Sequence, residues 1–192
     1  MGLRIDRKQD TRTVHACTHK LADIPNGVTV SVADLLPGGV LKEGTPLGKD
    51  EAGLYHAVKT ARIVDAVAAS GTAIKVEKGS HFKKGDVVML TVGGTASAIS
   101  AIDNSEATYD TITVGSALGA AAKGAALVEA AEAGANKGAF KYKPKAYTGD
   151  SYNVEALNNH LVSAITIGQY KEAVCPAVSD DIKAAIPGVN FI

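Results

Sequence analysis

The chain has 192 residues, of which 46% are hydrophobic and 5% aromatic, with no tryptophan; this suits one domain with appendages and argues against a large aromatic enzyme pocket. Basic and acidic residues number 20 each, so the net charge is zero. The balance holds along the chain, with 9 basic and 8 acidic groups in residues 1–66, 5 and 7 in 67–134, and 6 and 5 in 135–192. No segment has the basic excess that binding to duplex nucleic acid requires.

The N-terminal residues are polar and show little apolar periodicity. We expect residues 1–12 to form an extended arm that becomes ordered only against another surface. The segment RTVHACTHKL fits an alternating strand with Val14 and Ala16 on one face. The start of the chain has no apolar run typical of a signal peptide, and no stretch is long enough to span a membrane. We therefore expect the protein to be made in the cytoplasm.

Residues 27–61 predict a meander of short strands. GVTVSV (27–32) alternates and is β-branched, as half-buried strands are. Pro37-Gly38-Gly39 then predicts a turn, and we expect two further strands around 45–48 and 54–58.

The strand pattern is clearest in the middle of the chain. Short apolar runs separated by Gly-rich turns predict strands at 72–76, 86–92, 95–102, 111–114 and 125–131. Gly93-Gly94 is typical of a hairpin turn, because glycine tolerates the positive φ that such turns require. This spacing indicates a small closed β-barrel or a β-sandwich.

Two stretches of this region follow one plan. IKVEKGSHFKKGDVVML (74–90) and ITVGSALGAAAKGAALV (112–128) both read Ile-x-Val, a Gly-Ser turn, an apolar residue, a Lys-Gly turn and an apolar strand. The loops differ in length, so we predict approximate internal symmetry. Two similar halves that close on each other would remove exposed strand edges.

The C-terminal part mixes clear and ambiguous signals. Residues 133–147 have the composition of a linker or exposed ribbon, and residues 150–175 fit either helix or strand. Ser179 can cap a short helix that Pro187-Gly188 ends, and the final VNFI would pack Phe191 and Ile192 against the core. The predicted fold is therefore mainly β. It has an arm and short-strand meander at 1–66, a β-barrel-like or sandwich module at 67–134, and a C-terminal segment with a short helix at 135–192.

Candidate metal-binding and nucleophilic residues are few. His15 and His19 have ligand spacing only on a helix, whereas their segment alternates like a strand, so we interpret them as surface histidines. The acidic stretch DNSEATYD (103–110) lacks the pattern of an EF-hand loop and is interpreted as a solvated turn, with a weak cation site as the alternative. Cys17 and Cys175 are expected to be free, partly buried thiols, although a single disulfide between them stays open.

Two lysine-containing stretches have features of binding sites. Lys78 lies in a turn where a biotin or lipoate carrier would place its modified lysine, but its neighbours Glu77 and Gly79 do not match such a site. KGAFKYKPKAY (137–147) interleaves lysines with aromatic residues, as single-stranded nucleic acid binding would need. We instead expect these lysines to protect an exposed edge strand or to meet an acidic patch on a partner.

The sequence contains no GxSxG, GxxxxGK[ST] or GxGxxG-helix motif. We therefore assign no catalytic, cofactor-binding or metal-binding residue, and we predict that the protein is not an enzyme.

The chain resembles head fiber and capsid decoration proteins of tailed phages and prophages of gut bacteria. The phrases that carry the resemblance are LKEGTPLGKDEAGLYHAVKTA, VEKGSHFKKGDVVML, YDTITVGSALGAAAKGAALVEA and EAVCPAVSDDIKAAIPGVNFI, which lie within residues 28–192. The resemblance implies a non-enzymatic structural protein on the capsid exterior. Its partners would be the major capsid protein and its own copies, for example in a trimer, and neither nucleic acid nor a membrane. The alternatives are a cofactor-carrying or small-molecule-binding β-barrel and, less favoured, a hydrolase or peptidase acting in virion maturation.

Overall fold

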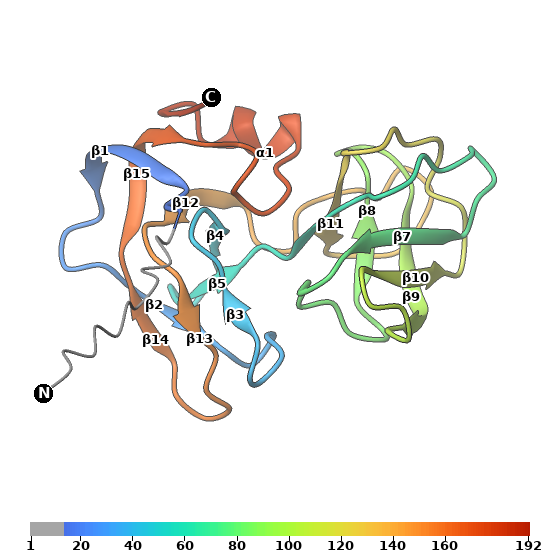
Figure 1. Cartoon of the computed structure of the whole chain (residues 1–192), viewed down its shortest axis with the longest axis horizontal. Coiled ribbons are helices and arrows are strands. Elements are labelled where there is room, and N and C mark those ends of the chain that lie inside the picture. The colour runs from blue at the N-terminus through green and yellow to red at the C-terminus, as the bar shows by residue number, and fades with distance from the viewer. Residues whose placement is uncertain (1–13) are drawn as a thin grey trace, which may run out of the picture.

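The computed structural model describes residues 14–192, so the predicted arm at residues 1–12 lies outside the described part. The chain is mainly β, with three sheets and one short helix (Figure 1). We call the eight-stranded and two-stranded sheets, together with the helix, the body. We call the six-stranded sheet, built from residues 60–130, the half-barrel lobe. Figure 1 shows the two side by side, with the chain crossing between them twice.

The body is held by a sheet whose strands come from both ends of the described chain. Its order is β1-β15-β12-β4-β5-β2-β14, with β16 parallel to β15. The strands are β1 (Cys17–Asp23), β2 (Val28–Ser31), β4 (Pro46–Lys49), β5 (Tyr55–Ala57), β12 (Pro144–Thr148), β14 (His160–Val162), β15 (Ala164–Tyr170) and β16 (Val189–Phe191). The short strands β3 (Val40–Leu41) and β13 (Tyr152–Asn153) pair beside it.

The half-barrel lobe is a curled sheet in the order β6-β11-β8-β9-β10-β7. Its strands are β6 (Thr60–Arg62), β7 (Ala73–Glu77), β8 (Val87–Met89), β9 (Ala96–Asp103), β10 (Tyr109–Val114) and β11 (Ala126–Ala130). The two edges of the sheet meet at one isolated antiparallel bridge between Ile63 and Val76. The apolar residues of alternate positions point into one core of the lobe.

The internal repeat predicted from the sequence is confirmed. β7 of the first copy pairs with β10 of the second, and β8 pairs with β11. The two Lys-Gly turns are also equivalent: Gly85 and Gly124 have φ of +94° and +88°, and their N–H groups donate to the carbonyls of Ile99 (2.9 Å) and Ile63 (2.8 Å). Positive φ is favourable for glycine, which explains why each copy keeps one at this corner.

The lobe and the body share an apolar core. All five residues of β11 are buried. Leu127 belongs to the core of the lobe, whereas Ala126, Val128 and Ala130 pack with the body cluster that includes Tyr170. A strand that is buried on both faces is typically a continuous apolar run in the sequence, as residues 126–128 of β11 are. The two parts are therefore packed together and not merely tethered.

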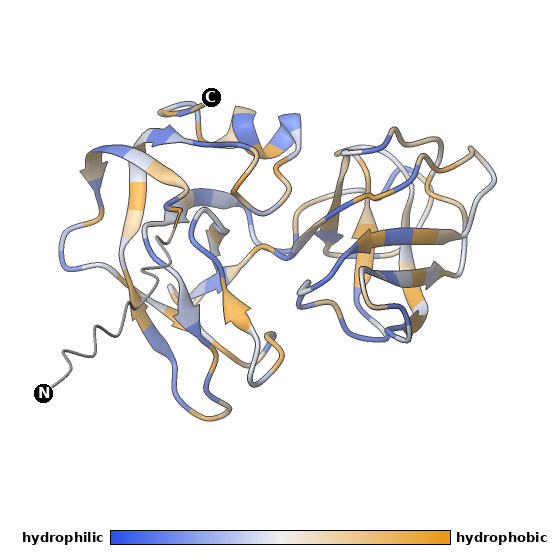
Figure 2. Ribbon diagram, in the orientation of Figure 1, coloured by the Kyte–Doolittle hydropathy of each residue, from blue (hydrophilic) through white to orange (hydrophobic). Residues whose placement is uncertain are grey.

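The C-terminal helix forms as predicted. α1 (Asp180–Ala185) begins after Ser179, whose hydroxyl accepts from the N–H of Ile182, and Pro187 follows its end. In Figure 2, α1 is mainly hydrophilic with an apolar side, and Ile182 on that side is fully buried. No helix within residues 14–192 has the length and apolar character to cross a membrane.

The structure revises two C-terminal expectations, on residues 144–148 and on Ile192, and decides the stretch 150–175 that the sequence left open. Residues 144–148 are not a linker but strand β12, which lies inside the eight-stranded sheet between β15 and β4. The ambiguous stretch 150–175 contains strands β13, β14 and β15 and no helix. Phe191 packs edge-on against Tyr147 as expected, but Ile192 stays largely exposed.

Candidate functional site

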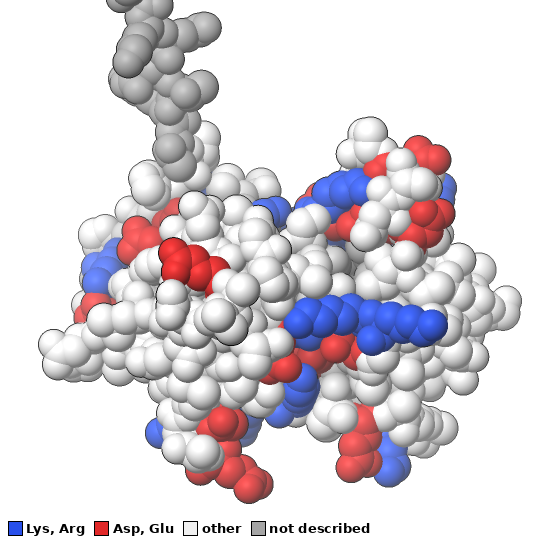
Figure 3. Space-filling view, turned by 90° about the horizontal axis from the view of Figure 1, so that it is seen from below, with Lys and Arg blue, Asp and Glu red and all other residues white. Residues whose placement is uncertain are grey.

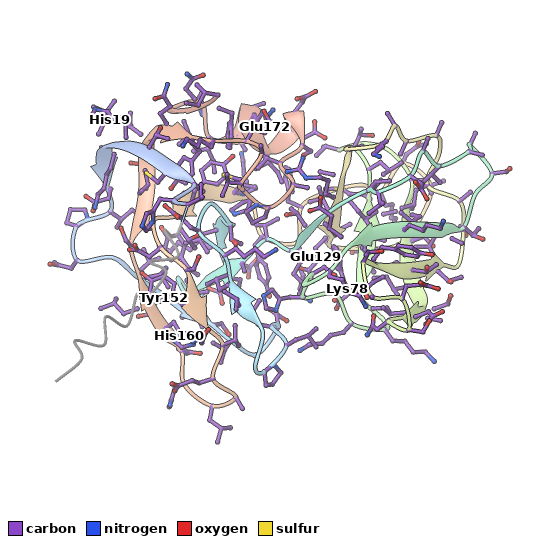
Figure 4. All side chains as sticks on the ribbon, in the orientation of Figure 1. His19, Lys78, Glu129, Tyr152, His160 and Glu172 are labelled. Carbon is purple, nitrogen blue, oxygen red and sulfur yellow. The ribbon has the colours of Figure 1, made fainter. Side chains whose placement is uncertain are left out.

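A chain of charged side chains joins the body to the half-barrel lobe. We call it the junction network; its members are Asp34, Asp50, His56, Lys59, Asp86, Glu129, Lys141 and Tyr142. In Figure 3 a row of basic groups crosses the junction of the two parts with acidic groups beside it, and Figure 4 places Glu129 at this junction. The network therefore fixes the two parts by ion pairs in addition to their shared apolar core.

Lys59 occupies the most buried end of the network. It follows β5 at the first crossing between the two parts, and its side chain is 1% exposed. Its Nζ lies 2.7 Å from Oδ2 of Asp86 and 3.1 Å from Oε1 of Glu129, so two carboxylates face one ammonium group. Lys141, from the second crossing, also contacts Oε1 of Glu129 at 3.1 Å. Pairing of this kind is what makes a buried charge tolerable.

The other end of the network is organised around Asp34. Its Oδ2 accepts from the Tyr142 hydroxyl at 2.9 Å and contacts Nδ1 of His56 at 3.0 Å, while Oδ1 lies 3.3 Å from Nζ of Lys141. Burial opposes ionisation of this carboxyl, but the Tyr142 hydroxyl and the Lys141 charge outweigh it and lower the pKa of Asp34. Burial and the neighbouring Asp34 raise the pKa of Tyr142 to about 12, so its hydroxyl stays a donor.

Beside the network, the lobe and the body line a partly open cavity of about 50 Å³. His81, on the turn before β8, contacts the body at its edge. Its Nδ1 accepts from the N–H of Leu36 at 3.2 Å, so the Nε2 at 3.0 Å from the carbonyl of Val40 is the donor. Burial lowers the pKa of His81. The neutral ring therefore links the two parts.

A second charged feature fixes the first described residues to the body. The buried carboxylate of Glu43 accepts from the N–H groups of Ala16 and Cys17, each at 2.9 Å, and lies 3.3 Å from Nδ1 of His15. Next to it is a surface hollow of about 380 Å³ that includes Val14 and Val174. We call this contact the Glu43 clamp.

The histidines and acidic residues weighed for metal binding are not brought together. His15 faces Glu43, and His19 lies on the exposed strand β1, as Figure 4 shows at the far end of the body. Within residues 14–192 no three His, Cys, Asp or Glu side chains converge as a metal site would require.

Lys78 is partly exposed and is held by other residues of the half-barrel lobe. Its Nζ lies 2.6 Å from Oδ1 of Asp110 and donates to the carbonyl of Asn104 at 2.9 Å. The lysine considered as a carrier residue therefore pairs with the acidic stretch 103–110 considered as a cation site. Lys78 thus balances the charge of Asp110, and the stretch 103–110 holds the Lys78 side chain in place.

The basic and aromatic stretch 137–147 is partly buried: Lys137, Lys143 and Lys145 are exposed, whereas other residues contact the interior. Tyr147 is fully buried, Tyr142 stacks on His56 at 4.0 Å, and Lys141 belongs to the junction network. Because β12 is an interior strand, the expectation that these lysines protect an edge is wrong; Lys137 and Lys141 meet acids of the same chain.

Both cysteines are free, as expected from the sequence. Cys175 is buried beside Gly44, and burial, reinforced by the charge of Glu43, raises the pKa of its thiol to about 12. Burial followed by the same carboxylate also raises the pKa of Cys17. Both groups are therefore protonated at neutral pH and are weak nucleophiles.

Comparison of the chain with protein-family models, with curated proteins and with solved structures finds no match in any of the three.

The junction network was not predicted from the sequence. Its signal was present: Lys59 and Glu129 are single charges within the short runs AVKTA (57–61) and AALVEAA (125–131). A charge embedded in such a run is buried only if it is paired. The pairing itself connects residues 70 positions apart, which no local pattern reveals.

Proposed function

We propose that the chain is a non-enzymatic subunit of a phage virion, a head fiber or capsid decoration protein that binds the capsid exterior and associates with its own copies. The proposal starts from the sequence resemblance and is supported by the surface features of the body. It includes the half-barrel lobe acting as a closed β-barrel module, which the Ile63–Val76 bridge between its edges favours.

The Glu43 clamp is the observation that carries the proposal. Both oxygens of the buried Glu43 carboxylate accept hydrogen bonds from the backbone N–H groups of residues 16 and 17. Residues 1–13 therefore precede a point of the chain that is fixed on the body. Those thirteen residues contain four basic and two acidic groups. A short basic segment fixed at its root is suited to binding an acidic protein surface, because complementary charge steers and orients association.

Self-association is supported by the edge of the eight-stranded sheet. β1 ends that sheet, and Leu21 on it is 68% exposed. Its neighbour Ala22 faces Ile167 of β15, which is also exposed. An edge strand with adjacent apolar side chains can pair with a second chain and bury that surface.

Co-sedimentation with capsids that lack the protein tests the capsid assignment. The intact chain should pellet with such capsids, and a chain lacking residues 2–13 should stay in the supernatant. A matched variant that replaces Arg4, Arg7, Lys8 and Arg12 by glutamine separates charge from chain length, and it should bind weakly. Equal binding of the truncated and intact chains would remove the arm from the contact, and absence of binding by the intact chain would refute the proposal.

A further inference from the structure

Lys59, Asp86 and Glu129 form a buried group in which one amine contacts two carboxyl groups. The Lys59 amine is 1% exposed and the Glu129 carboxyl 2% exposed, so water has little access to either group. The Lys59 Nζ lies 2.7 Å from Oδ2 of Asp86, so the amine and the carboxyl group that would react are already held in contact.

We propose that Lys59 and Asp86 condense spontaneously into an intramolecular isopeptide bond, with Glu129 transferring the proton. The Nζ lone pair of Lys59 attacks Cγ of Asp86, a C–N bond forms, and one C–O bond of the carboxyl breaks. The ammonium and carboxylate together yield an amide and one water: two of the three ammonium protons leave with the departing oxygen. Neither an oxidant nor another reactant is required.

The acceptor carboxyl is held in a suitable state for attack. Oδ2 of Asp86 accepts from the backbone N–H of Lys83 at 2.8 Å. A backbone N–H aimed at this oxygen stabilises the negative charge that develops on it in a tetrahedral intermediate. The Asp86 side chain is partly exposed, so the departing water has a path to solvent.

Glu129 is placed to move the proton. Its Oε1 lies 3.1 Å from Nζ of Lys59, and its buried Oε2 has no hydrogen-bond partner among the described residues. Lys141 contacts the same Oε1 and keeps the carboxyl oriented. A free, desolvated carboxylate oxygen can take a proton from the attacking amine and return it to the leaving oxygen.

Burial favours the reaction because the condensation consumes one ammonium and one carboxylate and yields an uncharged amide, and the cost of holding charges is greatest away from water. The chain offers a comparison: Lys75 and Asp65 form a pair at 3.0 Å, but both are well exposed. Water surrounds that pair, so burial gives no advantage to an uncharged amide and we expect no condensation there.

The intact mass of the denatured full-length protein tests the proposal. The wild-type chain should be lighter than its sequence mass by one water, and a protease digest should contain a branched peptide joining the segments around Lys59 and Asp86. Lys59→Arg and Asp86→Ala should restore the full mass, and Glu129→Gln should slow or abolish the loss. Lys75→Arg, the matched control, should still lose one water.

Wild-type protein that stays at full mass after prolonged incubation of the folded chain would overturn the proposal, even if the variants fold poorly. Water loss that persists in Lys59→Arg, or a branch at another lysine, would also overturn it. Water loss in Glu129→Gln at the wild-type rate would remove Glu129 from the reaction. The mass measurement does not depend on capsid binding, so it can fail or succeed independently of the proposed function. It also separates the isopeptide bond from a carrier lysine, because attachment of a cofactor would make the chain heavier.

Discussion

Oε1 of Glu43 accepts the N–H of Cys17 at 2.9 Å, although the two residues are 26 positions apart in the sequence. The other oxygen of the same carboxylate accepts the N–H of Ala16, so one buried side chain satisfies two consecutive backbone groups. Glu43, in the loop before β4, therefore fixes the start of the described chain together with the pairing of β1 with β15 and the hydrogen bond from the N–H of Lys171 to the carbonyl of Ala16.

Replacement of Glu43 by glutamine should destabilise the protein. The amide keeps one acceptor oxygen and turns an NH₂ group toward a buried backbone donor, and an unsatisfied buried group costs about 1–3 kcal/mol. Urea unfolding measures the loss. Glu51→Gln, at an exposed turn, should leave the unfolding free energy unchanged. Equal stability of Glu43→Gln and the wild type would show that the clamp contributes little.

Stability should fall as the pH drops below the ordinary histidine value because of His81. Burial lowers the pKa of the folded ring, whereas the unfolded ring takes up a proton near pH ~6.5. The unfolded chain then binds more protons than the folded chain, so stability is lost from about pH 6.5 downward until the folded pKa is reached.

The measurement compares unfolding free energies at about pH 7.5 and about pH 5.5, on either side of that value. His81→Asn should show a smaller decrease than the wild type. His19→Asn, on exposed β1, should keep the wild-type decrease. An unchanged decrease in His81→Asn would place the pH dependence on other groups.

Gly39 is expected to tolerate no side chain. A β-carbon there would lie 2.8 Å from Cε1 of His81 and 3.0 Å from the carbonyl oxygen of Leu36. Gly39→Ala should therefore displace the ring and destabilise the fold by about 1–3 kcal/mol, as overpacking does. At Gly115 the nearest atom would be 3.6 Å away, so Gly115→Ala is the control and should be nearly neutral. Thermal unfolding of the two variants checks the difference.

Leu21 should contribute to self-association. If copies meet along β1, Leu21→Ser removes exposed apolar surface from the contact and should shift the mass measured by light scattering toward the monomer. Leu157→Ser removes a leucine that is also exposed but precedes β14, at the opposite edge of the sheet. A shift only in Leu157→Ser would move the contact to that edge, and a wild-type monomer at micromolar concentration would contradict self-association.

Much of the half-barrel lobe was predictable because its information is local. The repeated Ile-x-Val and Lys-Gly corners fixed which residues point inward: Ile74, Val76, Ile112 and Val114 are all buried. The capped helix was predictable for the same reason. β8 proved shorter than the predicted 86–92, because Leu90 to Gly94 form the turn.

β12 was not predictable from composition. Lys143 and Lys145 point outward while Pro144 and Ala146 are buried, so a strand alternation exists but looks like a basic linker. The partners that make it a strand, β4 and β15, come from distant parts of the chain. The same holds for the junction network, whose charges are explained only by long-range packing.

The chain enters the half-barrel lobe at β6 and leaves it at β11, and these two strands are antiparallel neighbours: Thr60 faces Val128. Entry and exit therefore start from almost one place on the body. Natural variation or protein engineering can exchange or enlarge everything between these two positions without moving the ends that the body must connect. A replacement module needs one apolar strand face to cover the residues that β11 now shields.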